Sequence, residues 1–427
     1  MNKSTHRVEV VPLKLEKHPG ADKLSVVRVF GFTCVTQTSQ WGEATLAAFV
    51  PDDTLVPVDH PAFAFLASKA KYEDGTMARI KPIKLRGVQS MGLLVAAPPG
   101  AKEGDDAAEF YRVKRYEPPI RGGCGGNGPG GGLFTSGEVA TAPEGTPTFK
   151  YDLEAGRRYA HKVFTHGEPV VVTEKLHGAS SRYVFDGHRM HCGSRNEWKK
   201  EYPSYEHVTT QMVAEGLLRK NRAALEKSPD AVPLSEAEAT ERAATIIAKL
   251  NAEPKPRNMW WQALDATPAL RAFCEANPGV VVYGEVYGAV QDLPYGHKKG
   301  EVSFAAFDMW EPAVGRFMDA EDFLQLACQY SLPRVPLLNE TAVCDIANGF
   351  IRTIAIEPIP FDFDAICAMA EGPSLVKGAA NVREGVVVKP LKERWDEHVG
   401  RVAMKWVGNG YLERSPDPEP AEVACGD

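Results

Sequence analysis

Four strand-like apolar runs of this sequence carry charged residues at positions that strands seldom give to charges. The runs read VVVTEKLHG, VVVYGEVYG, REGVVVKP and RVAMKWV, and the residues of interest are, in order, Lys175, Glu285, Glu384 and Lys405. Lys and Glu are poor strand formers, and burying either charge among valines is costly without a partner or a ligand. The four placements therefore predict one pocket for a charged ligand.

The amine of Lys175 is the expected nucleophile of this pocket, since an amine that attacks phosphorus forms a covalent nucleotidyl adduct. A free lysine with a pKa of roughly 10.4 is protonated near neutrality and cannot attack. Carboxylates at Glu285 and Glu384 would by themselves favour the ammonium form. Mg²⁺ or Mn²⁺, held near both carboxylates directly or through water, would oppose that effect and shield phosphate charge. The pattern thus predicts metal-assisted nucleotidyl transfer.

The short motif Lys-x-x-Gly does not by itself select the nucleophile. It occurs at Lys17, Lys84, Lys175 and Lys405. Only Lys175 follows a β run that ends in Thr-Glu, and only Lys175 precedes both Glu-bearing runs. The order of the runs, rather than the motif, therefore selects Lys175.

The elements that must position these residues follow a glycine-rich boundary, RGGCGGNGPGGG. Before it, short alternating runs separated by turn residues predict a small all-β barrel over residues 1–120. We expect a linker over 121–145 and a mixed α and β catalytic domain over 146–412. A helical stretch runs from about 205 to 275, and Ser235 with Glu238 predicts a capping box within it. The acidic, Pro-rich residues 413–427 predict a disordered tail.

Composition limits the classes of protein further. The net charge of −7 over 427 residues argues against binding nucleic acid through bulk positive charge, so local basic patches must serve. The cysteines show no C-x-x-C pair and no Cys/His cluster at zinc spacing, so we expect no zinc site. The N-terminus lacks the apolar core of a secretory signal, and no run approaches the roughly 18 apolar residues of a membrane span. We expect a cytoplasmic protein with no membrane association.

The local basic patches fall in three stretches of the chain. Their members are Lys69, Lys71, Arg79, Lys81, Lys84 and Arg86, then Arg112, Lys114, Arg115 and Arg121, then Arg189, Arg195, Lys199 and Lys200. Each stretch alone could equally be a solvated surface.

Six segments, in order, resemble the nucleotidyl-transferase motifs of the ATP-dependent RNA ligases. They are TEKLHGAS, GSRNEWK, VVVYGEVYG, VSFAAFDMW, REGVVVK and AMKWVGNGYL, and they cover most of residues 165–412. KHPGADKLSVVRVFGF and RIKPIKLRGVQSMGLL resemble the OB module that precedes the catalytic domain in bacterial nick-sealing RNA ligases. The resemblance implies an α+β protein: an OB-type β-barrel followed by an antiparallel-sheet nucleotidyltransferase domain.

The resemblance also implies a reaction in three steps. Lys175 takes AMP from ATP, AMP passes to a 5′-phosphate, and a 3′-hydroxyl then displaces AMP to join two RNA ends. Glu285 and Glu384 would hold the metal, while Lys405 and Lys389 would contact the α-phosphate or the leaving pyrophosphate. This last motif has Val407 where many RNA ligases have a second lysine, so the division of labour between Lys389 and Lys405 stays open.

The remaining expected site residues concern the base and the nucleic acid. Phe304 is expected to stack on adenine and to share a strand face with Asp308, which could serve the pocket or cap a turn. The backbone of Glu174 is expected to lie against the adenine edge. Arg195 would engage the AMP phosphate or the nick, because its guanidinium suits bidentate phosphate contact. His177 is expected to act in a later step.

Two other readings remain open at this point. One is a different covalent nucleotidyltransferase, such as a capping-type enzyme or a DNA ligase, although only sixteen residues follow Tyr411, too few for the C-terminal OB domain of those enzymes. The other is a non-catalytic tRNA- or RNA-binding protein, because HPGADKL also resembles tRNA-binding OB modules. That reading explains only the first third of the chain.

Overall fold

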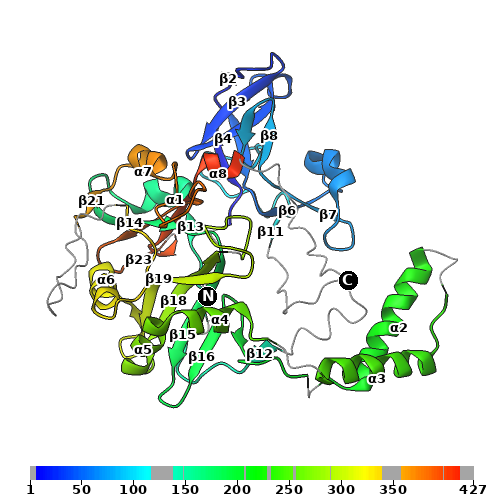
Figure 1. Cartoon of the computed structure of the whole chain (residues 1–427). Coiled ribbons are helices and arrows are strands. Elements are labelled where there is room, and N and C mark those ends of the chain that lie inside the picture. The colour runs from blue at the N-terminus through cyan, green and yellow to red at the C-terminus, as the bar shows by residue number, and fades with distance from the viewer. Residues whose placement is uncertain are drawn as a thin grey trace.

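The computed structural model describes residues 6–116, 138–147, 149–205, 208–227, 232–252, 256–288, 290–338, 357–397 and 399–413. These residues form an N-terminal β module, two large sheets with flanking helices, and a helical hairpin at one side (Figure 1). This arrangement confirms the predicted α+β class. No helix among the described residues is both long and apolar enough to cross a membrane.

The N-terminal module consists of short antiparallel strands around two apolar clusters. Its pairings run β1–β5–β10, β2–β3–β4, β11–β6–β7 and β8–β9. The strands are β1 (Glu9–Pro12), β2 (Glu16–Lys17), β3 (Leu24–Val29), β4 (Phe32–Gln37), β5 (Leu46–Val50), β6 (Thr54–Pro57), β7 (Met77–Arg79), β8 (Ile83–Leu85), β9 (Val88–Ser90), β10 (Leu93–Ala96) and β11 (Lys114–Arg115), with 3-10 helices at Thr38–Gln40 and Pro61–Lys69.

The larger catalytic sheet has seven strands in the order β12–β17–β16–β15–β18–β19–β20. Its neighbouring strands pair antiparallel, and a bulge interrupts the β18–β19 register between Tyr283 and Gly284. The strands are β12 (Val139–Ala140), β15 (Ala179–Phe185), β16 (Met190–Ser194), β17 (Trp198–Lys199), β18 (Val281–Gly288), β19 (Val302–Glu311) and β20 (Arg316–Phe317).

The second sheet has five strands in the order β13–β25–β22–β14–β21, and only its β13–β25 pair is parallel. Valine-rich runs build its centre, because β-branched side chains suit a strand that is buried on both faces. The strands are β13 (Glu154–Ala155), β14 (Pro169–Lys175), β21 (Ile359–Pro360), β22 (Gly385–Pro390) and β25 (Met404–Val407); β23 (Trp395–Asp396) and β24 (Gly400–Arg401) form a separate hairpin.

Helices cover the outer face of each sheet. The larger sheet packs on α4 (Met259–Ala266), α5 (Pro268–Ala276) and α6 (Ala320–Gln329), and the smaller sheet packs on α1 (Gly156–Val163) and α7 (Phe363–Met369). Between the sheets lies a small cluster of Leu176, Leu293, Tyr295, Ala305 and Val335. We call the sheet faces that point toward one another the inner faces.

The predicted helical stretch from 205 to 275 contains α4, α5 and a hairpin of α2 (Thr210–Lys227) and α3 (Glu236–Ala252). The hydroxyl of Ser235 accepts a hydrogen bond from the N–H of Glu238, whose carboxylate bonds Ser235 in return, so the predicted capping box is confirmed. The hairpin projects away from both sheets and has its own apolar core (Figure 1).

The N-terminal module packs against α1. Lys162 lies 2.9 Å from the buried Glu9, Arg158 donates to the carbonyl of Arg7, and Phe30 stacks on His161. Of the linker predicted for 121–145, residues 121–137 lie outside the described part, and by Val139 the chain has joined the larger sheet as β12. In the predicted tail, residues 414–427 likewise lie outside the described part.

Candidate active site

Lys175 stands at the end of β14, where it pairs with Gly385 of β22. On this sheet Val170 and Val172 of β14, with Val386 and Val388 of β22, pack under the helices. Because strand side chains alternate, Lys175 points to the inner face. Its Nζ lies 2.6 Å from Oε1 of Glu384, the residue just before β22. The first predicted lysine and glutamate are therefore in direct contact.

Gly178 brings the second glutamate to the same place. A Cβ on Gly178 would lie 2.2 Å from the carbonyl oxygen of Val286 and 3.1 Å from Cγ of Glu285, so only glycine lets the chain after Lys175 run this close to β18. Burial raises the pKa of Glu285 to about 8. The positive charge of Lys175 opposes this rise, and the negative charge of Glu384 adds to it. The three predicted groups thus act on one another.

The carboxylate of Glu384 has an oxygen that could bind a second cation besides Lys175. Burial alone would raise the pKa of Glu384, but the charge of Lys175, together with His177, holds it below its ordinary value. Its second oxygen, Oε2, is buried and has no hydrogen-bond partner. A divalent cation prefers such carboxylate oxygens, and Glu285 offers a second pair. No group of three or more His, Cys, Asp or Glu that could hold a metal ion is found in the described ranges.

Lys405 joins this cluster from β25. It pairs with Val387 of β22, whereas its neighbours Met404 and Trp406 belong to the helix-covered core, so Lys405 faces inward like Lys175. Burial and the nearby charge of Lys175 lower the pKa of Lys405, and the charges of Asp152 and Glu384 oppose them. Two lysines and two glutamates predicted from the sequence therefore lie within electrostatic reach of one another.

Arg195 reaches the cluster from the larger sheet. The register pairs Ser181 with Ser194 and Ser180 with Glu285, so Arg195, the next residue after β16, lies in the same row as Glu285. Its charge lowers the pKa of Glu285, although less than that of Lys175 does. Its guanidinium lies 2.7 Å from the carboxylate of Asp152.

His177 is held above Glu384 by groups that the sequence did not suggest. Its Nε2 lies 2.8 Å from Asp292, its Nδ1 lies 3.6 Å from Glu384, and its backbone N–H donates to the hydroxyl of Tyr295. Tyr411 contacts the ring from α8 (Asn409–Glu413). A role for His177 in a later step stays a prediction, but the ring lies beside the carboxylate that contacts Lys175.

Comparison with known proteins now decides the family. The model of the RNA ligase family matches residues 168–407, which includes every residue of the cluster except Asp152. The chain belongs to the RNA ligase family. An OB-fold domain model matches residues 7–97 of this RNA ligase, in agreement with the predicted N-terminal module. No curated protein gave a match.

Solved structures show the same fold along the whole chain. A mutant RNA ligase of Naegleria gruberi with ATP and Mn is 19% identical, with a TM-score of 0.61 over 95% of this chain and 98% of that one. The Naegleria enzyme with PPi is 20% identical, with a TM-score of 0.60 over 95% and 97% of the two chains. A mutant of it without ligand is 19% identical, with a TM-score of 0.62 over 97% and 99%.

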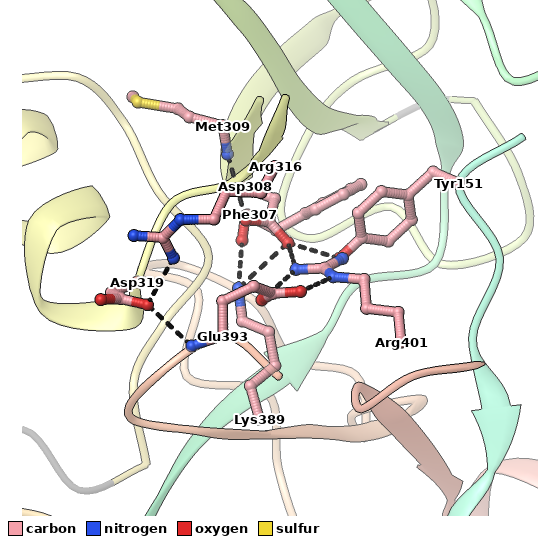
Figure 2. A network of polar contacts seen from close by, with 9 residues as sticks. All are labelled: Tyr151, Phe307, Asp308, Met309, Arg316, Asp319, Lys389, Glu393 and Arg401. Carbon is pink, nitrogen blue, oxygen red and sulfur yellow. Dashed lines mark hydrogen bonds and ion pairs between the residues drawn. The ribbon is translucent and has the colours of Figure 1, made fainter. Parts of the chain in front are cut away.

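Lys389, the other lysine predicted to contact phosphate, contacts a carboxylate of the fold in this structure. Lys389 pairs with Val171, four residues along β14 from Lys175, and its Nζ lies 3.2 Å from Oδ2 of Asp308. Figure 2 shows that the fully buried Asp308 also receives Arg401 and the hydroxyl of Tyr151. Lys389 is thus a structural counter-ion in this structure, and Asp308 is the centre of an ion network rather than a turn cap.

The expected stacking residue is also corrected. Phe304 pairs with Val286, and both lie on the helix-covered face, whereas Glu285 pairs with Ala305 on the inner face. Phe304 is 2% exposed and packs edge-to-face on Tyr183. It also borders a cavity of about 300 Å³ that is lined from the α4–α5 turn and by none of the four charged residues. Phe307, which packs on Tyr151, is the phenylalanine on the inner side.

Glu174 turns its side chain away from Lys175, as alternation along the strand predicts. One carboxylate oxygen accepts the N–H of Leu375, and the other is buried without a partner. Burial raises the pKa of this carboxyl. Contact between its backbone and adenine remains a prediction.

Proposed function

We propose that this RNA ligase uses ATP to join 3′-hydroxyl and 5′-phosphate RNA ends at nicks in a duplex. The observation that supports the proposal is the convergence of Lys175, Glu384, Glu285 and Lys405 on the inner faces of the two sheets. The alternatives with a capping-type or DNA-ligase function, or with no catalysis, lack an observation that favours them over the family match.

In the first step the uncharged amine of Lys175 attacks the α-phosphorus of ATP. A P–N bond forms, the bond to the β-phosphate oxygen breaks, pyrophosphate leaves, and the amine gives up a proton. Oε1 of Glu384, 2.6 Å away, orients the amine. Lys405 is placed to stabilise negative charge that develops on the phosphate oxygens. Mg²⁺ or Mn²⁺, held by Glu285 and Glu384, would supply positive charge that shields the triphosphate.

In the later steps AMP moves to the RNA and then leaves. An oxygen of the 5′-phosphate attacks the lysyl-AMP phosphorus, which forms a P–O–P bond and frees the Lys175 amine. The 3′-hydroxyl then attacks the 5′-phosphorus, so that a phosphodiester forms and AMP departs. His177 lies beside Glu384 and Lys175, where it can hold a proton or a phosphate oxygen during these exchanges.

Nucleotide labelling tests the first step. Wild type and Lys175→Ala are incubated with Mg²⁺ or Mn²⁺ and with α-labelled ATP or, separately, α-labelled GTP. We expect an acid-labile protein–nucleotide bond from ATP only, and none in Lys175→Ala. Lys392→Ala, which removes an exposed lysine near Asp319, is the matched control and should label normally. Absence of label from wild type, or label that survives in Lys175→Ala, would contradict the proposal.

Nick sealing tests the substrate. The labelled protein is mixed with duplexes that carry a 5′-phosphate nick flanked by RNA or by DNA. We expect release of AMP and a joined strand with the RNA nick. Transfer to DNA nicks alone would refute the RNA assignment while leaving the lysyl-AMP step intact.

A further inference from the structure

Asp152 occupies a place where positive charges from three parts of the chain converge. Its Oδ2 lies 2.7 Å from Arg195, which follows β16 of the larger sheet, and 3.6 Å from Arg115, on β11 of the N-terminal module. Lys405 of the smaller sheet lies close enough for the charge of Asp152 to act on its amine. One carboxylate therefore serves cations from both sheets and from the OB-type module.

The position of Asp152 does not depend on these ion pairs. The preceding residue, Tyr151, is half-buried and its hydroxyl donates to Asp308, and two residues after Asp152 the chain enters β13, where Ala155 pairs with Lys405. Residues 149–155 thus form a strap fixed at both ends. The strap presents the Asp152 carboxylate between the two arginines, which are free to change partner without any movement of the backbone.

The ion pairs themselves are easy to exchange. The side chains of Arg115, Asp152 and Arg195 are 42%, 40% and 46% exposed. Pairs this exposed contribute only about 0–1 kcal/mol, because water screens them. A terminal phosphate carries nearly two negative charges and three acceptor oxygens, and it accepts bidentate bonds from guanidinium groups. Phosphate is therefore the stronger ligand for the same arginines.

The location favours the 5′-phosphate of the nucleic acid over the phosphates of ATP. Arg195 lies in the row of Glu285, so a phosphate bound to Arg195 would lie beside Lys175. The attack of the 5′-phosphate on lysyl-AMP requires this position. Arg115 belongs to the N-terminal module, of which the OB-fold model matches residues 7–97, and OB folds bind nucleic-acid strands. Asp52 of the same module also lies near Lys405. Burial raises the pKa of Asp52, and the charge of Lys405 opposes that rise.

We propose that Arg115, Arg195 and Lys405 form a binding site for the 5′-phosphate at a strand break, and that the carboxylate of Asp152 fills this site in the free protein. The inference rests on the proposed RNA-ligase function and deepens it. The 5′-phosphate would displace Asp152 and tie the OB-type module to the catalytic sheets at the moment when the break is engaged.

Binding of nicked duplexes tests this site with the full-length protein in the absence of ATP. The probes are one nicked RNA duplex with a 5′-phosphate and one with a 5′-hydroxyl at the nick. Asp152→Asn keeps the shape of the side chain and should tighten binding of the 5′-phosphate nick by about three- to tenfold, with less effect on the 5′-hydroxyl nick. Arg115→Ala should weaken the 5′-phosphate nick by a similar factor.

Matched controls separate this site from a general effect of charge. Asp59→Asn and Arg112→Ala remove the two members of another exposed ion pair in the same module, and should change binding of both nicks equally and slightly. In the Arg115→Ala, Arg195→Ala double variant, Asp152→Asn should no longer tighten binding.

Three results would overturn the proposal: no change in binding by Asp152→Asn, equal tightening of both nicks, or a shifted ATP dependence of Lys175 labelling with nick binding unchanged. The last would assign the site to the triphosphate. Failure of the ligase assignment itself shows separately, as absence of label from ATP in wild type.

Discussion

Lys389 and Lys405 face the same side of one sheet, yet their amines meet different charges. Lys389 contacts Asp308 and donates to the carbonyl of Phe307, so its charge is neutralised inside the fold. Lys405 instead lies near a second lysine, and burial lowers its pKa. We therefore propose that Lys389 is a stabilising charge and that Lys405 is the charge that contacts phosphate. Sequence motifs alone leave this division open, because both residues follow strand alternation equally well.

Substitution of each lysine by methionine should separate the two roles. Lys389→Met should lower the free energy of unfolding by about 1–3 kcal/mol, since it removes one of several partners of a buried carboxylate. Lys405→Met should leave stability unchanged or slightly raised, because it removes a poorly solvated charge, and should slow labelling of Lys175 about 100-fold or more. Urea unfolding and initial labelling rates measure both. Loss of labelling without loss of stability in Lys389→Met would reverse the assignment.

At the scale of elements, the sequence predicts those features that depend on strand alternation and on local composition. The α+β class is implied by the resemblance to RNA ligases, whereas the helical stretch, the capping box and the convergence of the four charged runs follow from local pattern. The faces of β19 do not, because the register pairs Gly284 with Ala306 but Tyr283 with Asp308. This bulge breaks the period of two, so Asp308 lies on the inner face while Phe304 lies on the outer one. No residue type in VSFAAFDMW announces the bulge, and no motif marks Asp152.

The first residue of α1 gives a test of how closely elements pack. A Cβ on Gly156 would lie 2.3 Å from the ring of Trp406 on β25. Alanine is the better helix former by about 1 kcal/mol, but overpacking against a fully buried ring costs about 1–3 kcal/mol. We therefore expect Gly156→Ala to be destabilising. In the presence of Trp406→Phe the effect should shrink or change sign, as a double-mutant cycle of unfolding free energies would show. A stabilising Gly156→Ala in wild type would contradict the clash.

At the scale of the whole molecule, the N-terminal module is bound to the catalytic domain through buried polar groups. His6 contacts Thr54 within the module and lies near Arg158 of α1. Burial, and then the charges of Arg158 and Arg115, lower the pKa of His6 from 6.5 to about 4. The folded protein therefore keeps His6 neutral where the unfolded chain would protonate it.

This difference makes stability depend on pH with a defined sign. Between pH 6.5 and about 4 the unfolded state binds more protons at His6, so stability should fall as the pH falls through this window and be fully present above it. His6→Gln should flatten the fall, whereas His188→Gln, at an exposed position, should not. Urea midpoints from pH 7.5 to 4.5 measure the difference. If the urea midpoints of wild type and His6→Gln fall in parallel with pH, protonation of His6 does not contribute to the pH dependence of stability.

The helical hairpin of α2 and α3 has a consequence for how this enzyme can diverge. Its core, which includes Val213, Leu217 and Ala243, shares no member with the core beneath the larger sheet. After the hairpin, the indoles of Trp260 and Trp261 donate to the carbonyls of Ser180 and Lys199, which fixes the returning chain to β15 and β17. Because the hairpin has a core of its own and the chain is fixed again directly after it, we expect changes in the length or surface of the hairpin to alter stability and chemistry little.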